Sequence, residues 1–308
     1  MVFDTTPFYA ESGGQVGDTG FIMANDEKIS IIDTKKENNL IIHLASKLPK
    51  DPTADFTAVV NKNNRKSTEN NHSATHLLHF ALRKVLGKHI EQKGSLVHPD
   101  YLRFDFSHFQ KVTPEEIEKV EIIVNELIRK NINLEEMHDV PMKKASEMGA
   151  MALFGEKYGD HVRVIKFDES VELCGGTHVH STGQIGFFKI LSEGAISAGV
   201  RRIEAITSEK AEEFIRQNLK ELDEIKILFN NTKNLKQSVE NLLEENSKLV
   251  KQIEEFNKEK AKLIKSELIT KIEKIGEIQF IGSIVQLESA ANIKDLSFQL
   301  KNEVENLI

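Results

Sequence analysis

The chain has 308 residues, of which 39% are hydrophobic and 29% charged, and its formal net charge is −7. This length allows two or three domains, and the acidity argues against a wholly basic nucleic-acid binder. Without an apolar run of about 20 residues or a signal-peptide pattern, we expect no membrane partner. Cys174 is the only cysteine, which excludes an internal disulfide framework and favours a cytoplasmic location.

Residues 1–60 predict a small β-rich subdomain. Four short runs of β-type residues lie between clusters of Gly, Asn and Asp. The runs are 21–23, 29–32, 40–44 and 56–60. Short strands punctuated in this way are typical of a small sheet or barrel, and we expect a barrel-like arrangement.

Residues 61–208 predict an α+β body. Apolar residues at helical spacing indicate a helix over 66–92. Thr113 precedes Pro-Glu-Glu, a typical helix start, and this second helix is expected to run to about Asn131. Short helices and strands then alternate over 145–206. Two of these strands are expected at 163–167 and 186–191.

A local excess of basic residues follows the first subdomain. Residues 61–111 contain nine Lys or Arg and four Asp or Glu, so nine minus four leaves +5 for this stretch. Such a patch fits an RNA-facing surface, and it fits a solvated helix face equally well.

Residues 209–275 predict a long helical linker. Apolar residues follow an alternating spacing of four and three, which is the seam of a heptad repeat. The seam residues are Leu235, Val239, Leu242, Leu249, Ile253, Phe256 and Leu263. The polar run 230–234 predicts a break, so a helical hairpin and an intermolecular coiled coil both remain open. Residues 276–308 contain an expected strand and helix, which we interpret as the truncated α/β start of a further domain.

Four potential metal ligands occur as two pairs with the same spacing. His72 and His76 are four residues apart on the predicted helix, and Cys174 and His178 are four residues apart with two glycines between them. Three imidazoles and one thiolate form a suitable set for tetrahedral Zn²⁺, so we predict one zinc ion. His79 extends the first pair by a turn, and we expect it in the core or behind the ligands.

The two pairs resemble those of the editing domain of alanyl-tRNA synthetases. Further segments fit the same family: 4–18, 92–97, 102–107, 150–158 and 201–204. The related threonyl-tRNA synthetase domain shares the ligand spacing but has Arg-Gly-Pro where this chain has Gly-Gly-Thr. It also lacks the Ser-Gly-Gly-Gln opening.

The resemblance implies a division of the chain into parts of a larger synthetase. Residues 1–60 would be the barrel subdomain of the editing domain and 61–208 its zinc-binding core. Residues 209–275 would be the helical linker and 276–308 the start of the C-terminal domain. The family's ATP-using, alanine-activating domain lies upstream, so we expect no alanine activation from this chain.

The activity implied is hydrolysis of tRNA(Ala) that carries Ser or Gly at its acceptor end. The family places the Thr75 hydroxyl in the editing pocket and ties the position of Gln92 to editing. Gln15 ends a Gly-Gly-Gln tripeptide that could position water, although a glycine turn between strands explains it equally well. Whether zinc would touch the substrate or only hold the fold remains open, because four protein ligands close its coordination sphere.

Contacts with the acceptor-end phosphates are expected from Lys93, Arg201 and Arg202, and ordinary salt bridges are the alternative for all three. A homodimer through the helical or C-terminal region is a further expectation. Two other functions fit the residues. One is a free-standing editing deacylase, and the other is a non-catalytic, zinc-stabilised RNA-binding and oligomerisation module.

Overall fold

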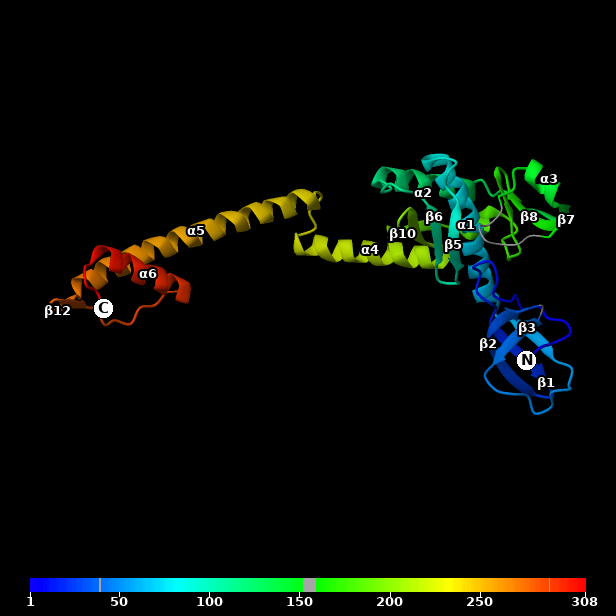
Figure 1. Ribbon diagram of the computed structural model, residues 1–308, viewed down its shortest axis with the longest axis horizontal. Helices are drawn as coiled ribbons and strands as arrows, with labels where there is room; N and C mark the ends of the chain where they lie inside the picture. Colours follow the sequence, from blue (N-terminus) through cyan, green and yellow to red (C-terminus); the bar gives the residue numbers. More distant parts are fainter. Residues whose placement is uncertain (39, 152–158, 288) are drawn as a thin grey trace. The chain divides into compact units, whose positions relative to one another are not determined.

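The fold is known from a computed structural model and is α+β, with several small sheets and helices (Figure 1). The structure describes residues 1–38, 40–151, 159–287 and 289–308. The chain divides into two compact units, Met1–Leu219 and Lys220–Ile308. A search of the described helices finds none long and apolar enough to cross a membrane. Most of the family-like segment 150–158 lies outside the described residues.

The first four strands form an antiparallel sheet in the order β3-β2-β1-β4. Their bounds, β1 Gly20–Ala24, β2 Glu27–Glu37, β3 Leu40–Ala45 and β4 Thr57–Val60, confirm the four predicted runs. Alternate side chains of β1 and β2 pack with Phe8 in a small core. The barrel-like prediction was wrong, because the edge strands β3 and β4 do not pair among the described residues. Small barrels close with about five to eight strands, whereas this sheet has four.

Helix α1 (Lys62–Leu86) is the central element of the following body. The Asn61 side chain caps its first turn by accepting from the Asn63 and Asn64 amides. Gly87 ends it at φ 121°, a conformation that favours glycine, so α1 ends before the predicted residue 92. In Figure 1, α1 lies beside the sheet strands and next to α2.

A second antiparallel sheet and a helix cover α1. The sheet has the order β10-β11-β6-β5. Its strands are β5 Gln92–Val97, β6 Leu102–Ser107, β10 Phe188–Ser197 and β11 Val200–Thr207. Helix α2 (Pro114–Arg129) begins with the predicted capping box, in which the Thr113 hydroxyl accepts from the Glu116 amide and the Glu116 carboxylate accepts from the Thr113 amide. Leucines of α1 and phenylalanines of β6 form the main hydrophobic core together with apolar residues of α2, β10 and β11.

A three-stranded sheet has the order β7-β8-β9, and Cys174 directly follows its last strand. Its strands are β7 Glu135–Pro141, β8 His161–Phe167 and β9 Ser170–Leu173, with α3 (Met142–Glu147) packed on them. The 3₁₀ turn η1 (Thr182–Ile185) then leads to β10. Because β9 contacts α1 and stops at Leu173, the Cys174–His178 segment begins at the edge of α1.

Two helices follow the body, as the predicted break at 230–234 requires. Helix α4 (Ser208–Leu228) starts in the first unit, and α5 (Leu235–Thr270) belongs to the second and is capped by Asn234. The apolar seam of α5 is largely exposed at Leu242, Leu249, Ile253, Phe256 and Leu263. The coiled-coil pairing that this seam predicts therefore stays a prediction.

The second unit has a small core of its own near the end of α5. The hairpin β12 Glu273–Ile275 and β13 Ile278–Phe280 precedes α6 (Ala290–Glu303). Leu268 of α5 packs against Leu296 and Leu300 of α6. The sequence predicts a strand over 280–287, but the structure has one only over 278–280, where it pairs with β12, and residues 281–287 are not in a strand.

Candidate metal centre

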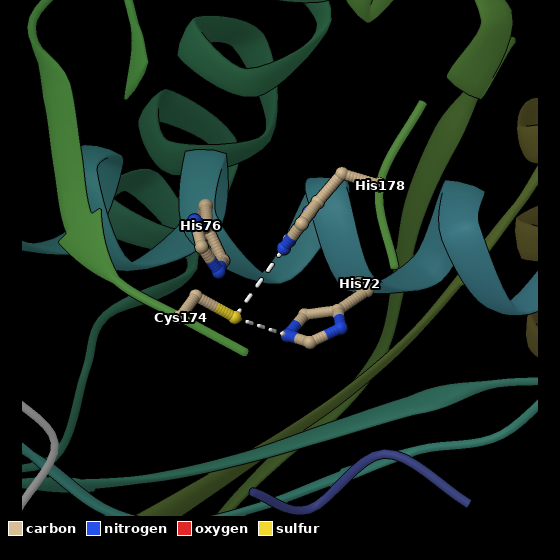
Figure 2. Close-up of side chains that lie close together, drawn as sticks. All are labelled: His72, His76, Cys174 and His178. Carbon is tan, nitrogen blue, oxygen red and sulfur yellow. Dashed lines mark hydrogen bonds between the residues drawn. The ribbon is translucent and has the colours of Figure 1, made fainter. Parts of the chain in front are cut away.

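The four predicted ligands lie together inside the first unit. His72 and His76 project from one face of α1, and Cys174 and His178 come from the segment after β9 (Figure 2). All four side chains are buried, and their ligand atoms lie within 4.8 Å of one another. Among the described residues this is the only group of His, Cys, Asp and Glu with the closeness that a metal ion requires.

The distances suit a small tetrahedral ion. The Cys174 Sγ atom lies 3.3 Å from His72 Nε2 and 3.3 Å from His178 Nε2. Ligand atoms around a tetrahedral zinc with bonds of about 2.0–2.3 Å are about 3.5 Å apart. His76 completes the group, because one of its ring nitrogens lies within 4.8 Å of the other three ligand atoms. The residues therefore fit one zinc ion.

The ring nitrogens of His72 and His178 that point away from Cys174 are both held by neighbours. His72 Nδ1 donates to Gln15 Oε1 over 2.7 Å. His178 Nδ1 lies 3.2 Å from Ser73 Oγ, and the same hydroxyl accepts the Val179 amide. Partners of this kind fix the orientation of imidazole ligands.

Behind His76 lies a buried carboxylate, Glu172 of β9. Its Oε2 atom is 3.5 Å from His76 Nε2, and its Oε1 atom accepts from His79 Nδ1 over 2.9 Å. Burial raises the pKa of Glu172, but the two imidazoles outweigh it, so the pKa lies below its usual range. His79 thus lies behind the ligands, as expected from the sequence.

The three ligand imidazoles favour the neutral form. Burial lowers the pKa of His72 and His178 well below the usual range, and neighbouring imidazoles and the Arg163 guanidinium lower it further. Burial also lowers the pKa of His76, although Glu172 opposes that shift. A neutral imidazole has the lone pair that binds a metal ion.

The Cys174–His178 segment is braced by contacts from distant parts of the chain. Arg163 Nη1 donates to the Cys174 carbonyl over 2.9 Å and to the Gly176 carbonyl over 2.6 Å. A Cβ atom on Gly176 would lie 2.1 Å from His72 Cε1, so only glycine fits against that ring. Nothing lies within 4 Å of a Cβ on Gly175. Gly176 therefore permits the close approach of the loop to the His72 ring, and Gly175 does not have this role. Neither glycine has the positive φ of a tight turn.

The predicted catalytic residues lie at or near this group, but their polar atoms have partners. Thr75 Oγ1 donates to the Asn71 carbonyl within α1 over 2.8 Å. Gln15 is fully buried, accepts from the Thr177 amide as well as from His72, and donates to Thr177 Oγ1. Both polar atoms of the Gln15 side chain thus have hydrogen-bond partners, and its role in positioning water stays a prediction.

Gln92 lies beside the glycine turn that contains Gln15. Its Nε2 atom donates to Ser95 Oγ over 3.1 Å, and Ser95 lies against Gly13 and Gly14. Both glycines have positive φ in a turn closed by backbone hydrogen bonds between Ser12 and Gln15. This agrees with the alternative of a glycine turn between extended segments.

The predicted phosphate-binding residues form ion pairs. Arg201 pairs with Glu193 of β10, and Arg202 makes two bonds of 2.6 and 2.8 Å with Asp105 of β6. Lys93 Nζ lies 2.9 Å from Glu91. These pairs agree with the salt-bridge alternative, and phosphate binding by the three residues stays a prediction.

Sequence reasoning missed the residues that support the ligands, namely Ser73, Arg163 and Glu172. Ser73 adjoins the ligand His72 on α1, and Glu172 lies two residues before the ligand Cys174. Their closeness to ligands in the sequence could have indicated both residues. Arg163 carried no such signal, because its contact depends on the pairing of β8 with β9.

Comparisons with known proteins identify the class of this centre. Residues 162–204, which contain Cys174 and His178, match the family model described as threonyl and alanyl tRNA synthetase second additional domain. Residues 1–64 match the model described as tRNA synthetases class II (A). Both models describe aminoacyl-tRNA synthetases, and His72 and His76 lie between the two matched ranges.

Whole-chain similarity narrows the family. The chain is 55% identical to an alanine–tRNA ligase of Parabacteroides distasonis over 98% of its length, and 55% identical to that of Cytophaga hutchinsonii over 100%. It is 53% identical to that of Bacteroides fragilis over 100%. The chain belongs to the alanine–tRNA ligase family. It spans about a third of these relatives, because the matched region covers 35% of each.

Proposed function

We propose that this chain contains the editing site of an alanine–tRNA ligase and hydrolyses seryl- and glycyl-tRNA(Ala). The observation that carries the proposal is the buried group of His72, His76, Cys174 and His178 in a member of this family. The family resemblance assigns editing to the domain with this ligand set. In the longer protein, a separate domain would ligate alanine to tRNA(Ala).

The chemistry of the substrates explains the need for such a site. A pocket that binds alanine cannot exclude the smaller glycine, and serine differs from alanine only by a hydroxyl. Differences of this size in an apolar pocket discriminate by only about 10- to 200-fold. A second site that binds the serine hydroxyl through polar groups would hydrolyse the seryl-tRNA(Ala) that the first site forms by mistake.

Named side chains would perform this selection. When bound here with one of the four ligand positions displaceable, zinc would supply a Lewis-acidic contact that orients the aminoacyl group. Thr75 lies between His72 and His76, and its hydroxyl would exchange its bond to Asn71 for one to the serine side chain. Gln15 would hold the His72 ring during this exchange.

The rest of the chain would deliver the substrate. Residues 1–60 and 61–208 would form the editing domain, 209–275 a helical linker and 276–308 the start of the C-terminal domain. Lys93 at β5 is proposed to approach the acceptor end of tRNA(Ala), and the exposed seam of α5 to support a homodimer. A cytoplasmic location follows from the proposed role in protein synthesis.

The test compares serine release from seryl-tRNA(Ala) with alanine release from alanyl-tRNA(Ala), using the zinc-loaded chain. We expect rapid release of serine and little release of alanine. Thr75→Val should reduce the preference for serine by about 10-fold or more, because valine keeps the shape but loses the hydroxyl. Thr68→Val is the matched control, since Thr68 makes the same bond to a carbonyl four residues earlier on α1.

One further reading is favoured by the four protein ligands and the burial of the group, namely a zinc site that only stabilises the fold. In that case the folded, zinc-loaded chain would release serine no faster than buffer alone, and Cys174→Ala would unfold it. Absence of serine release would contradict the editing proposal directly.

A further inference from the structure

A hydroxyl group lies beside the candidate metal centre on the loop side. Thr177 directly precedes the ligand His178, and it is partly exposed although Cys174 and His178 are buried. Among the described residues, the one partner of its hydroxyl oxygen is the side-chain amide of Gln15, at 2.9 Å. The backbone amide of Thr177 donates to Oε1 of the same glutamine over 2.9 Å. One buried side chain therefore holds Thr177 at two atoms.

The direction of the hydrogen bond between Gln15 and the Thr177 hydroxyl is determined by its neighbours. A backbone N–H can only donate, so the atom of the Gln15 amide that bonds the Thr177 N–H must be the oxygen. The other atom, Nε2, can then only donate, and Thr177 Oγ1 must accept from it. The hydroxyl thus uses a lone pair on Gln15 and keeps its proton, for which the described part of the chain offers no acceptor.

The hydroxyl of the other ligand pair is bonded in the opposite sense. Thr75 directly precedes His76, as Thr177 precedes His178. Thr75 Oγ1 donates to the Asn71 carbonyl over 2.8 Å, so its proton is already used within α1. The proton of Thr177, in contrast, can bond to a ligand without breaking any contact that the structure describes. Of the two hydroxyls, that of Thr177 is therefore the one prepared to donate.

The ester of an aminoacyl-tRNA offers an acceptor that suits this donor, because a carbonyl oxygen accepts hydrogen bonds and cannot donate them. During hydrolysis, water adds to the carbonyl carbon and an electron pair of the C=O double bond moves to its oxygen. The pair then returns, the bond to the ribose oxygen breaks, and the ribose oxygen takes a proton from the attacking water. A hydroxyl aimed at the carbonyl oxygen stabilises the negative charge that develops there.

We propose that Thr177 is a catalytic residue whose hydroxyl donates to the carbonyl oxygen of the ester, and that Gln15 is the positioning residue that aims its proton. Gln15 does this by donating to Thr177 Oγ1, which leaves the hydroxyl proton for the substrate. The inference rests on the proposed function and names a hydrogen-bond donor for the deacylation. It applies to seryl- and glycyl-tRNA(Ala) alike, because both substrates have this carbonyl.

The first experiment measures kcat and KM for serine release from seryl-tRNA(Ala). Thr177→Val keeps the shape of the side chain but has no proton to donate, so we expect kcat to fall by about 100-fold while KM changes little. Thr177→Ser keeps the hydroxyl and should retain most of the activity. Zinc affinity, measured by competition with a chelator, should be the same in all three proteins. An unchanged kcat in Thr177→Val, or a loss of zinc affinity as large as the loss of kcat, would contradict the proposal.

The second experiment reverses the hydrogen bond between Gln15 and Thr177. In Gln15→Glu the new carboxylate can still accept from the Thr177 amide and from His72, but it has no N–H, so the Thr177 hydroxyl would donate to it instead of to the substrate. We expect a loss of kcat similar to that of Thr177→Val, and no further loss when the two substitutions are combined. Gln184→Glu is the matched control, because Gln184 is exposed and its Oε1 atom accepts the His180 amide. It should keep full activity, and losses that multiply in the double variant would contradict the proposal.

A binding measurement separates this inference from the function on which it rests. The probe is the amide analogue of seryl-adenosine, in which a nitrogen replaces the ester oxygen, so its carbonyl accepts but the probe is not hydrolysed. Calorimetry with zinc-loaded protein should show binding that Thr177→Val weakens by about 2- to 10-fold, the usual effect of losing one neutral hydrogen bond. Equal affinities, or no binding by either protein, would overturn the role of Thr177 and leave editing standing wherever serine is released. Weaker binding by Thr177→Val, together with no serine release by the unaltered chain, would overturn editing and leave the contact with the carbonyl standing.

Discussion

The two ligand pairs of the metal centre have the same spacing, but different interactions hold them in place. His72 and His76 lie on α1, whose hydrogen bonds and apolar neighbours fix the pair whether or not a metal is bound. Cys174 and His178 lie in a segment without a regular element and depend on side chains of other elements. A helix therefore supplies a preformed half of the centre, and the loop supplies a half that must be assembled.

Removal of one ligand should have the largest effect. Four ligands share a zinc-binding free energy of about 10–16 kcal/mol, so loss of one costs about 3 kcal/mol, or about 100-fold in affinity. We expect this loss for both Cys174→Ala and His76→Ala in chelator competition. The two halves should differ in hydrogen exchange of the metal-free protein, with fast exchange in 174–178 and slow exchange in the middle of α1.

Equal exchange rates in these two segments would show that the loop is as rigid as the helix without metal. His89→Ala is the matched control for ligand loss, because His89 is exposed and lies beyond the end of α1. Its zinc affinity should equal that of the unaltered chain.

A methyl group on one glycine should have the next largest effect. In Gly176→Ala the new atom would lie 2.1 Å from the His72 ring, so the loop or the ring must move and the two halves separate. Overpacking of this kind costs about 1–3 kcal/mol, or roughly 5- to 150-fold in zinc affinity. Gly175→Ala, with open space around its new methyl, should bind zinc normally. Similar affinities for the two variants would contradict the close approach.

The two halves also differ in how far the sequence could predict them. A spacing of four places His72 and His76 on one helix face, so local periodicity was sufficient. For Cys174 and His178 the sequence predicted the ligands but not their support. Glu172 contacts residues of α1 more than ninety positions earlier, and such contacts depend on the register of strands. The barrel expectation failed for a related reason, because the four runs indicate strands but not which edges pair.

Loss of the loop brace should have the smallest of these effects. Arg163→Met removes the donor that holds the Cys174 and Gly176 carbonyls but keeps a side chain of similar length. Hydrogen bonds from a charged group contribute about 1.5–3 kcal/mol, and partial exposure of Arg163 places the expected loss in unfolding free energy at the lower end. Zinc affinity should fall by a few-fold, because the ligands remain but the loop must be ordered by the metal.

Lys166→Met on the same strand is the matched control for Arg163→Met. Lys166 pairs with Glu135 of β7 at 2.9 Å, and both side chains are partly exposed, so this pair contributes about 0–1 kcal/mol and touches no ligand. Urea unfolding of the two variants, with and without zinc, measures the difference. If Arg163→Met is no less stable than Lys166→Met, the loop is held by its ligands and by Gln15 and Ser73 alone. In that case the Cys174–His178 segment would depend on the bound metal for its order.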